Sequence, residues 1–368
     1  MPPVDADAGA IAGAVRRLAI IGTAKNVGKT VALRALLAAV ADRGETAGIT
    51  SVGRDGEARD VLDPSIVKPR IALAPGALVA TALPLMRRSA ARIELVASTP
   101  FRTPLGVVAI GRMVEAGEVE VAGPGSASAT AEVTDMMFSL GADRVLIDGS
   151  LDRRAAANPS VSDGVVLATG AVLDRDRTEV VRRTAIAAAL LRLPRVSDPE
   201  LRRTAERAAS HLAIGPDGAW PLPRSVVLRG GTEPDPEFDP LLARATHVVV
   251  RGALCEDFVA RVAAARADAR EAGDAPDRVT IVAPDAAKVF LDATAAARCA
   301  SAGIAVEVLD PITLVAVTVN PVAPGSHRFD PQTLCDELAR AVPDVAVLDV
   351  VAGIAAGDGA LVGAAGGQ

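Results

Sequence analysis

Apolar positions near the start of the chain change their spacing across a short glycine loop. Residues 18–21 form an uninterrupted apolar run, LAII, which is typical of a short buried strand ending at Gly22. After the loop, apolar residues recur at i, i+3, i+4 and i+7, namely at Leu33, Leu36, Leu37 and Val40. This spacing predicts a helix from about 29 to 42, and Gly44 follows where a helix end favours a left-handed residue. The pattern is a strand, a glycine loop and a helix.

Short apolar runs that end in glycine or polar residues continue through the first half of the chain. We predict strands in ETAGITSVGRDGE, TPLGVVAIG, ADRVLIDGSLDRR and SDGVVLATGAVL. The segment EVEVAGPGSASATAEVTDMMFSLGA is typical of a strand, a loop of small residues and a helix, and DRDRTEVVRRTAIAAALLRL of a further helix. The stretch from Pro64 to Pro104 is less regular. This alternation predicts an α/β fold with a mostly parallel sheet.

The second half continues the same alternation after RLPRVSDPE, which is a candidate boundary between domains. Five further strand candidates are RSVVLRG, ATHVVVRG, DRVTIVAP, IAVEVLD and TLVAVTVNP. We therefore predict a nucleotide-binding domain over residues 1–195, a second α/β domain over 196–356 and a flexible tail over 357–368.

Composition narrows the range of functions. The 368 residues are 50% hydrophobic and 23% charged with a net charge of −6, as in an ordinary globular protein. This mild acidity, together with one Trp, six Phe and no Tyr, argues against a nucleic-acid partner. Neither a zinc site nor a hydrolase motif is indicated, because the cysteines and histidines are scattered: Cys255, Cys299, Cys335, His211, His247 and His327.

The N-terminus and the hydropathy profile bear on location. MPPVDADAGAIAGAVRRLAI carries its acidic residues early and its arginine pair late, the reverse of a signal peptide. No apolar run reaches the roughly 18 residues that a membrane helix needs. We expect a cytoplasmic protein with no membrane partner.

The loop between the first strand and helix has the chemistry of a phosphate cradle. A helix N-terminus offers unpaired N–H groups and a partial positive charge, and glycine lets the backbone approach the phosphates. Lys29 would add a charge at the terminal phosphates, and the Thr30 hydroxyl would ligate Mg²⁺. We predict cofactor contacts from Gly22, Thr23, Lys25, Asn26, Val27, Gly28, Lys29 and Thr30. Five residues separate the two glycines, where the pattern G-x-x-x-x-G-K-[ST] has four.

Asp148, which closes the apolar run RVLID, is the predicted partner of Thr30 at the metal ion. A carboxylate at the end of such a strand holds Mg²⁺, usually through water. Ser150 and Asp152 follow closely and could face the same ion or order a water. The alternatives are that Asp148 caps the next turn and that the other two residues lie in a solvated loop.

Two other loops contain candidate site residues. Arg54, Asp55 and Glu57 follow the second strand, where open α/β sheets place ligands, and we group Asp55 with Lys29 and Asp148 as catalytic candidates. Asn320 follows the last strong strand and could hydrogen-bond a purine edge. The alternatives are a polar turn at 54–57 and a plain Asn-Pro turn at Asn320.

The loop GTAKNVGKT resembles the GT-x-T-x-x-GKT loop of the dethiobiotin synthetase family, with the same spacing between its two halves. GETAGITSVGRDGE is similar to that family's second strand and loop, ADRVLIDGSLD to its Walker B strand, and DGVVLATGAVLDRD to the strand and helix that follow. The resemblance covers roughly the first 190 residues. It implies a P-loop NTPase fold of the SIMIBI branch, with ATP and Mg²⁺ as cofactors.

Departures from that family lie on the substrate side. The synthetases carry Asp and Thr where this chain has Ala24 and Lys25, and a Lys-Pro pair where it has Ser51 and Val52. The partition and septum-site ATPases carry an extra lysine that would align with Ala24, one residue before Lys25. Lys25 could reach the γ-phosphate or a partner subunit, or it could be a solvated loop lysine. These differences indicate a shared nucleotide site with a different client.

IDGSLDRRAAANPSVSDGVVLATGAVLDRD and VNPVAPGSHRFDPQTL resemble the reactivase subunit of adenosylcobalamin-dependent lysine 5,6-aminomutases. This second resemblance implies an accessory ATPase that drives exchange of damaged cobalamin on a partner aminomutase, with the second half as the docking surface. The alternatives are an ATP-dependent ligase or kinase acting on a small carboxylate, and a non-catalytic nucleotide-binding regulator. The oligomeric state stays open, with a homodimer among the alternatives.

Overall fold

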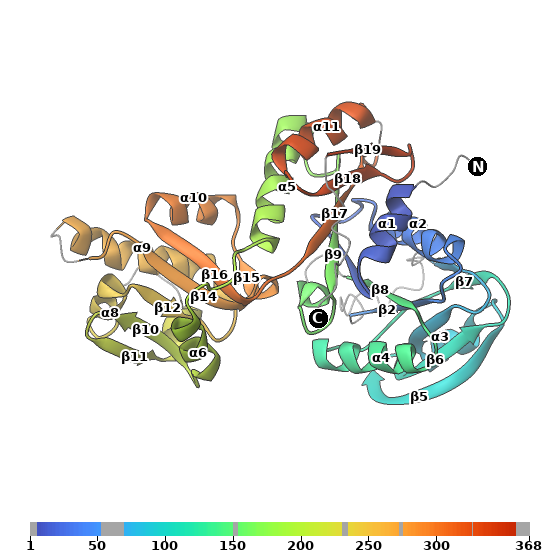
Figure 1. Cartoon of the computed structure of the whole chain (residues 1–368), viewed down its shortest axis with the longest axis horizontal. Coiled ribbons are helices and arrows are strands. Elements are labelled where there is room, and N and C mark those ends of the chain that lie inside the picture. Colours follow the sequence, from blue (N-terminus) through green and yellow to red (C-terminus); the bar gives the residue numbers. More distant parts are fainter. Residues whose placement is uncertain are drawn as a thin grey trace. The chain divides into compact units, whose positions relative to one another are not determined.

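The computed structural model describes residues 6–52, 70–149, 154–229, 235–271, 275–325 and 327–357 (Figure 1). The chain divides into two compact units. Unit 1 combines Met1–Ala185 with Thr313–Gln368, and unit 2 is the continuous segment Ile186–Ile312. Each unit has its own sheet.

The first part of unit 1 contains, in chain order, α1 (Ala6–Ala14), β1 (Arg17–Gly22), α2 (Lys29–Asp42), β2 (Ala47–Ser51), β3 (Ile71–Leu73), β4 (Leu78–Ala82), α3 (Leu83–Arg88), β5 (Ile93–Thr103), β6 (Gly106–Met113), β7 (Gly117–Val119), α4 (Ala127–Ser139), β8 (Arg144–Asp148), η1 (Arg154–Ala157), β9 (Gly164–Gly170) and α5 (Arg177–Leu191). Its final part adds β17 (Leu314–Asn320), α11 (Pro331–Ala341), β18 (Ala346–Asp349) and β19 (Ile354–Ala356). The helix α5 carries the chain from unit 1 into unit 2.

The large sheet of unit 1 has the strand order β19-β18-β17-β9-β1-β8-β2-β4-β6-β5. Neighbours from β18 to β4 run parallel, whereas β19, β6 and β5 are antiparallel to theirs. The short strands β3 and β7 form a separate antiparallel pair. In this order β8 and β2 lie on one side of β1, whereas β9, the strand that follows β8 in the chain, lies on the other side. The direction in which successive strands are added therefore reverses around β1. Ligands of open α/β sheets bind at the carboxyl ends of strands at such a reversal.

Helices cover both faces of this sheet, as the side chains of β2 show. Ala47 and Ile49 join the buried cluster formed with α1 and α2. Gly48 faces the other way, and a Cβ built on it would lie 2.9 Å from the Cε of Met137 in α4. Because side chains alternate along a strand, α2 and α4 lie on opposite faces. Unit 1 is therefore a three-layer α/β/α arrangement.

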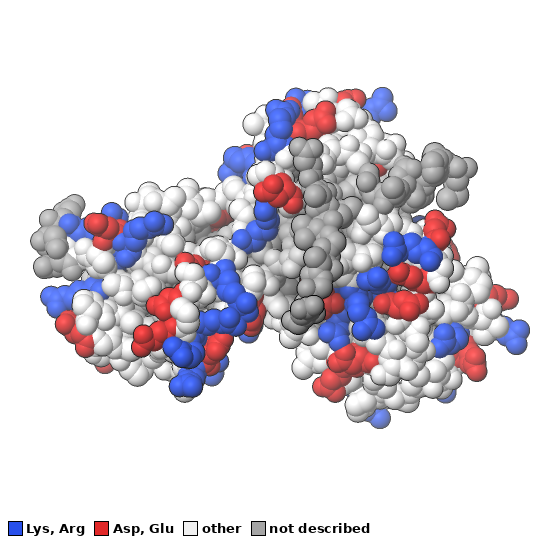
Figure 2. Space-filling view, viewed as in Figure 1, with Lys and Arg blue, Asp and Glu red and all other residues white. Residues whose placement is uncertain are grey.

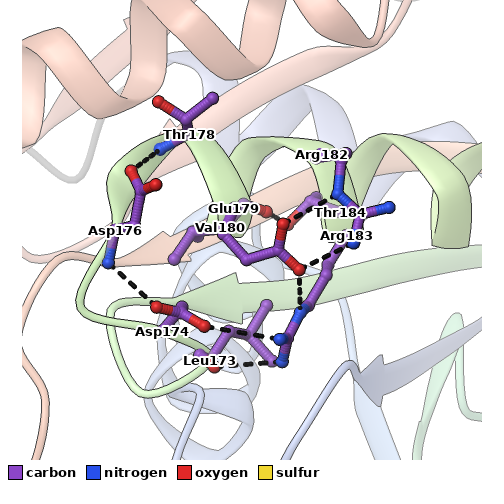
Figure 3. A network of polar contacts seen from close by, with 9 residues as sticks. All are labelled: Leu173, Asp174, Asp176, Thr178, Glu179, Val180, Arg182, Arg183 and Thr184. Atoms are coloured by element: carbon purple, nitrogen blue, oxygen red, sulfur yellow. Dashed lines mark hydrogen bonds and ion pairs between the residues drawn. The ribbon is translucent and has the colours of Figure 1, made fainter. Parts of the chain in front are cut away.

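A polar network fixes the start of α5 to the loop that precedes it (Figure 3). Glu179 accepts hydrogen bonds from Arg182 and Arg183, and these two bonds lower the pKa of its carboxyl to about 2. Arg183 also donates to the carbonyl of Leu173 and contacts Asp174. One helical turn is thereby joined to the connection from β9.

Unit 2 contains α6 (Pro199–Arg207), β10 (His211–Gly215), β11 (Gly218–Leu222), α7 (Arg224–Arg229), α8 (Asp239–Arg244), β12 (His247–Val249), β13 (Leu254–Cys255), α9 (Glu256–Glu271), β14 (Val279–Asp285), η2 (Ala286–Lys288), β15 (Val289–Phe290), α10 (Ala293–Ser301) and β16 (Ile304–Asp310). Its main sheet has the order β11-β10-β12-β14-β16, in which β12, β14 and β16 are parallel. The helix α6 packs on this sheet through Leu201 and Ala205. Figure 2 shows acidic and basic side chains interspersed over the face in view.

The α/β class and the mostly parallel sheet predicted from the sequence are confirmed. The predicted helix 29–42 coincides with α2, and Gly44 is left-handed with φ 73°. RSVVLRG, predicted as a strand, is the helix α7, because the chain turns after Pro223, whose carbonyl accepts from the N–H of Val226. In the described ranges, no helix is long and apolar enough to cross a membrane.

The predicted domain boundaries need correction. The segment TLVAVTVNP does form a strand, but this strand, β17, pairs in parallel with β9 and so belongs to the sheet of unit 1. The first domain therefore includes residues beyond 312, and unit 2 ends there instead of at 356. An apolar run predicts a buried strand without indicating which sheet it joins. Nearly all of the predicted tail, 358–368, lies outside the described residues.

Candidate functional site

The segment from Gly22 to Thr30, which we call the 22–30 loop, connects β1 to α2 at the carboxyl edge of the sheet. Two of its residues are left-handed, Asn26 with φ 62° and Gly28 with φ 88°. Asparagine and glycine are the residues that adopt this conformation at least cost. The sequence AKNVGK therefore folds back tightly before the helix begins.

The N-terminus of α2 has no side-chain cap. Gly28 occupies the N-cap position without a capping hydrogen bond, and the first turn contains no acidic residue. The first bond of the helix runs from the N–H of Ala32 to the carbonyl of Gly28 at 2.9 Å. The preceding N–H groups of the helix lack intrahelical acceptors, as at any helix start. Such an end is suited to bind an anion.

Lys29 lies across the loop toward β8. Its Nζ donates to the carbonyl of Gly149 at 3.1 Å. Gly22 makes room for this path, because a Cβ at that position would lie 2.9 Å from the Cδ of Lys29 and 2.8 Å from the Cγ2 of Val27. The glycine that begins the loop is thus needed for the course of the lysine side chain.

Asp148 ends β8 directly beside β1, where it is half-buried. It is the register partner of Ile20 in β1 and of Ser51 in β2. The next residue, Gly149, donates its N–H to the carbonyl of Ile20 at 2.9 Å and accepts from Lys29. The carboxylate of Asp148 and the ammonium of Lys29 therefore belong to adjoining positions at one edge of the sheet.

Thr23 is bonded to the neighbouring strand β9. Its N–H and its hydroxyl both donate to the carbonyl of Ala168, at 2.9 and 3.2 Å. The hydroxyl also lies 3.3 Å from that of Thr169, which in turn lies 2.6 Å from the hydroxyl of Thr184 in α5. A chain of three threonines thus connects the 22–30 loop to α5. The side chain of Thr23 holds the loop in place here.

Asn320 holds the other side of the loop. Its Nδ2 donates to the carbonyl of Asn26 at 3.2 Å, and its Oδ1 accepts from the N–H of Val322 at the same distance. Its Cβ would lie 3.1 Å from a Cβ built on Gly28, so the two segments are in close contact. The side chain that we predicted to hydrogen-bond a purine edge therefore already makes two hydrogen bonds within the protein.

A pocket of about 240 Å³ opens beside the 22–30 loop and the start of α2. Its walls come from the loop and α2, from the end of β17 and the residues after it, and from the end of β18: Val27, Gly28, Val31, Ala32, Thr318, Val319, Asn320, Pro321, Val322, Pro331, Asp349, Val350, Val351 and Ala352. Val31, Val322 and Val351 are 44%, 51% and 76% exposed, so the pocket presents apolar side chains to a ligand. The pocket is smaller than the sites that enclose whole drug-sized ligands.

The pocket also has polar groups that the sequence did not indicate. Thr318 and Asp349 are buried in its wall. Behind it, burial and the carboxylate of Asp349 raise the pKa of the Cys335 thiol to about 12, so this cysteine stays protonated. The strand pattern TLVAVTVN marked Thr318 only as a core position. Asp349 follows the apolar run VAVL, the same signal that identified Asp148.

The remaining predicted residues differ in their surroundings. Lys25 is exposed on the loop, and Val27 is 1% exposed, so only the backbone of Val27 is available to a ligand. Ser51 is buried and accepts from the N–H of Gly123 at 2.9 Å. Two groups of candidates lie outside the described residues: Arg54, Asp55 and Glu57, and Ser150 and Asp152.

The donors at this edge fit a hard divalent cation together with an anionic ligand. Thr30 in the first turn of α2 and Asp148 at the end of β8 offer hydroxyl and carboxylate oxygens, the ligand type that Mg²⁺ prefers. Two protein oxygens are few for a metal site, but Mg²⁺ commonly completes its shell with water and phosphate oxygens.

Comparisons with protein-family profiles, with curated proteins and with solved structures find no match to this chain.

Proposed function

We propose that this protein binds ATP with Mg²⁺ at the 22–30 loop and hydrolyses it, and that unit 1 is a P-loop NTPase domain. The observation that carries the proposal is the uncapped start of α2 under a left-handed glycine turn, with Lys29 lying over the loop. Backbone N–H groups, a helix end and a lysine are the groups that hold the phosphates of a nucleoside triphosphate.

The adjoining pocket supports a nucleotide over a simpler anion. It begins at Val27 and Gly28, so a ligand with phosphates at the loop would extend its base into it. Its exposed valines offer an apolar surface to a flat ring, and none of the described residues that line the pocket is aromatic. Its volume of about 240 Å³ is enough for part of a nucleotide, as expected if the base enters the pocket while the phosphates bind at the 22–30 loop outside it.

The proposed chemistry assigns a role to each group at the sheet edge. Thr30 and Asp148 would hold the metal ion, which neutralises phosphate charge when bound. Lys29 would leave the Gly149 carbonyl, 3.1 Å away, and turn its ammonium toward the terminal phosphates. The N–H groups at the start of α2 would bind phosphate oxygens, so positioning and charge neutralisation supply the catalysis.

The client of this ATPase is proposed from sequence resemblance. We infer an accessory role, reactivation of an adenosylcobalamin-dependent aminomutase, with unit 2 as the docking part. Basal hydrolysis would then be slow and would rise with the partner enzyme. The alternative is a dethiobiotin-synthetase-like ligase or kinase. In that case a small carboxylate substrate alone would drive rapid ATP consumption.

Calorimetry of Lys29→Ala tests the site. We expect Mg²⁺-dependent ATP binding to fall below detection, because the substitution removes the ammonium that lies across the loop toward Gly149. Lys288→Ala, at the end of η2 in unit 2, is the matched control and should bind as the unmodified protein does. Unchanged affinity in a folded Lys29→Ala protein would disprove the assignment.

A further inference from the structure

A buried histidine at one edge of the sheet of unit 2 has a ring nitrogen without an acceptor. His211 begins β10 and is 6% exposed. Its Nδ1 accepts from the main-chain N–H of Arg251 at 2.9 Å, so in the neutral ring the proton is on Nε2. No residue in the described part of the chain accepts from Nε2, although this nitrogen is not sealed from solvent. A donor held in this way is suited to a ligand that supplies the acceptor.

Two arginines follow the strands on either side of this histidine. His211 pairs with Leu222, the last residue of β11, and Arg224 comes two residues later. On the other side β12 ends at Val249, and Arg251 comes two residues later. Because β11 and β12 both run antiparallel to β10, their ends and the start of β10 meet at one edge of the sheet. This is also the carboxyl edge of the parallel strands β12, β14 and β16, where α/β sheets bind ligands.

The two guanidinium groups have no carboxylate partner among the described residues. Arg224 and Arg251 are exposed, and neither forms an ion pair there. Arg251 donates instead to the carbonyl of Ala205 in α6 at 3.2 Å. Asp285, at the same edge on β14, is the N-cap of η2. Burial and, after it, the charges of the two arginines lower the pKa of His211, and no carboxylate offsets them.

We propose that unit 2 binds the phosphate group of a small molecule, or the phosphate ion itself, at His211, Arg224 and Arg251. The Nε2–H of His211 and the guanidinium N–H groups of both arginines donate to its oxygens. Three donor groups from the ends of three strands suit a tetrahedral anion, which has more acceptor oxygens than a carboxylate, and bonds from arginine to phosphate are charge-assisted. The site belongs to unit 2 and does not depend on the nucleotide site proposed for unit 1.

Histidine-ring NMR of the whole protein tests this site, because the chain has three histidines. Inorganic phosphate, titrated at constant ionic strength, should shift the ring signals of His211. Those of His247, at the opposite end of β12, should move far less. Acetate should bind at least about tenfold more weakly than phosphate, and equal binding would overturn the phosphate assignment. Glycerol 3-phosphate at least about tenfold tighter than phosphate would identify an ester as the ligand, and equal binding the ion; either result supports the site.

Arg224→Gln and Arg251→Gln should each weaken phosphate binding about tenfold, because each removes charge-assisted donors. The bond to Nδ1 remains in both variants, since the main chain donates it. Arg244→Gln, in the last turn of α8, is the matched control and should bind as the unmodified protein does. The proposal is overturned if phosphate leaves the His211 signals of the unmodified protein in place, or if it still shifts them as strongly in a folded double variant, Arg224→Gln with Arg251→Gln. Either failure would leave the proposal for the 22–30 loop intact, because the signal comes from unit 2.

Discussion

Asn320 donates from its side-chain amide to the backbone carbonyl of Asn26 at 3.2 Å, and so joins two loops that are 294 positions apart in the sequence. The bond holds a left-handed residue of the 22–30 loop against the end of β17. This places Asn320 in a supporting role for the loop.

Asn320→Asp should therefore weaken nucleotide binding without abolishing it. The substitution keeps an oxygen for the N–H of Val322 but places an acceptor against the carbonyl of Asn26. We expect a loss of about fivefold to tenfold in ATP affinity, the worth of one hydrogen bond and a mild repulsion. Asn158→Asp, at a turn after η1, serves as control in the same titration. An affinity equal to that of the unmodified protein would show that the loop holds its shape without this bond.

Gly22→Ala should disturb the loop through the side chain of Lys29. The new methyl group would lie 2.8 Å from Val27 and 2.9 Å from Lys29, closer than carbon atoms approach without strain. We expect a loss of about 1–3 kcal/mol in unfolding free energy and at least a tenfold loss in ATP affinity, measured by denaturant titration and calorimetry. Gly9→Ala in α1 meets nothing within 4 Å and should be neutral or slightly stabilising. Similar behaviour of the two variants would contradict the role assigned to Gly22.

His211 should make the stability of the protein depend on pH. Its Nδ1 accepts from the N–H of Arg251 at 2.9 Å, so the folded chain holds the neutral ring. Burial and, after it, the positive charges of Arg224 and Arg251 lower the pKa of His211 from 6.5. Below pH 6.5 the unfolded chain then binds more protons than the folded one, and the unfolding free energy falls as the pH falls toward the folded pKa.

Urea titrations at pH 7.5 and 5.5 would measure this effect. The contribution is fully present above about pH 6.5 and decreases below it. His211→Gln should reduce the difference between the two pH values, because glutamine offers an acceptor to Arg251 but does not titrate. An equal pH response in His211→Gln and the unmodified protein would rule out His211 as the source.

The sequence predicted individual helices and strands more closely than it predicted which strands pair with one another. The spacing of Leu33, Leu36, Leu37 and Val40 predicted α2 to the residue, because an apolar stripe and its flanking glycines are local signals. The return of β17 to the first sheet was not predictable in this way. Its apolar residues would be equally buried in either sheet, and the choice depends on contacts with β9 far away in the sequence.

The same distinction applies to the candidate site. Gly28, Lys29 and Asp148 were predicted because a motif with fixed spacing indicates them. Thr318 was missed because it is an ordinary position of a buried strand. Asp349 follows an apolar run as Asp148 does, but it lies far in the sequence from the glycine loop, and only the fold places both residues beside the pocket. Asn320 was identified by its place after a strand, but the structure shows its amide bonded to the backbone of two loops.

The insertion of unit 2 between β9 and β17 has a consequence for biosynthesis. A nascent chain that has emerged only as far as residue 312 has already made the 22–30 loop, but it lacks Asn320, Thr318 and Asp349. The edge of β9 meanwhile remains open to wrong pairing, although unit 2 is continuous and can fold beside it. If the proposed nucleotide site is correct, its full affinity is expected only after translation has passed β18, because β17 and β18 supply the far wall of the pocket.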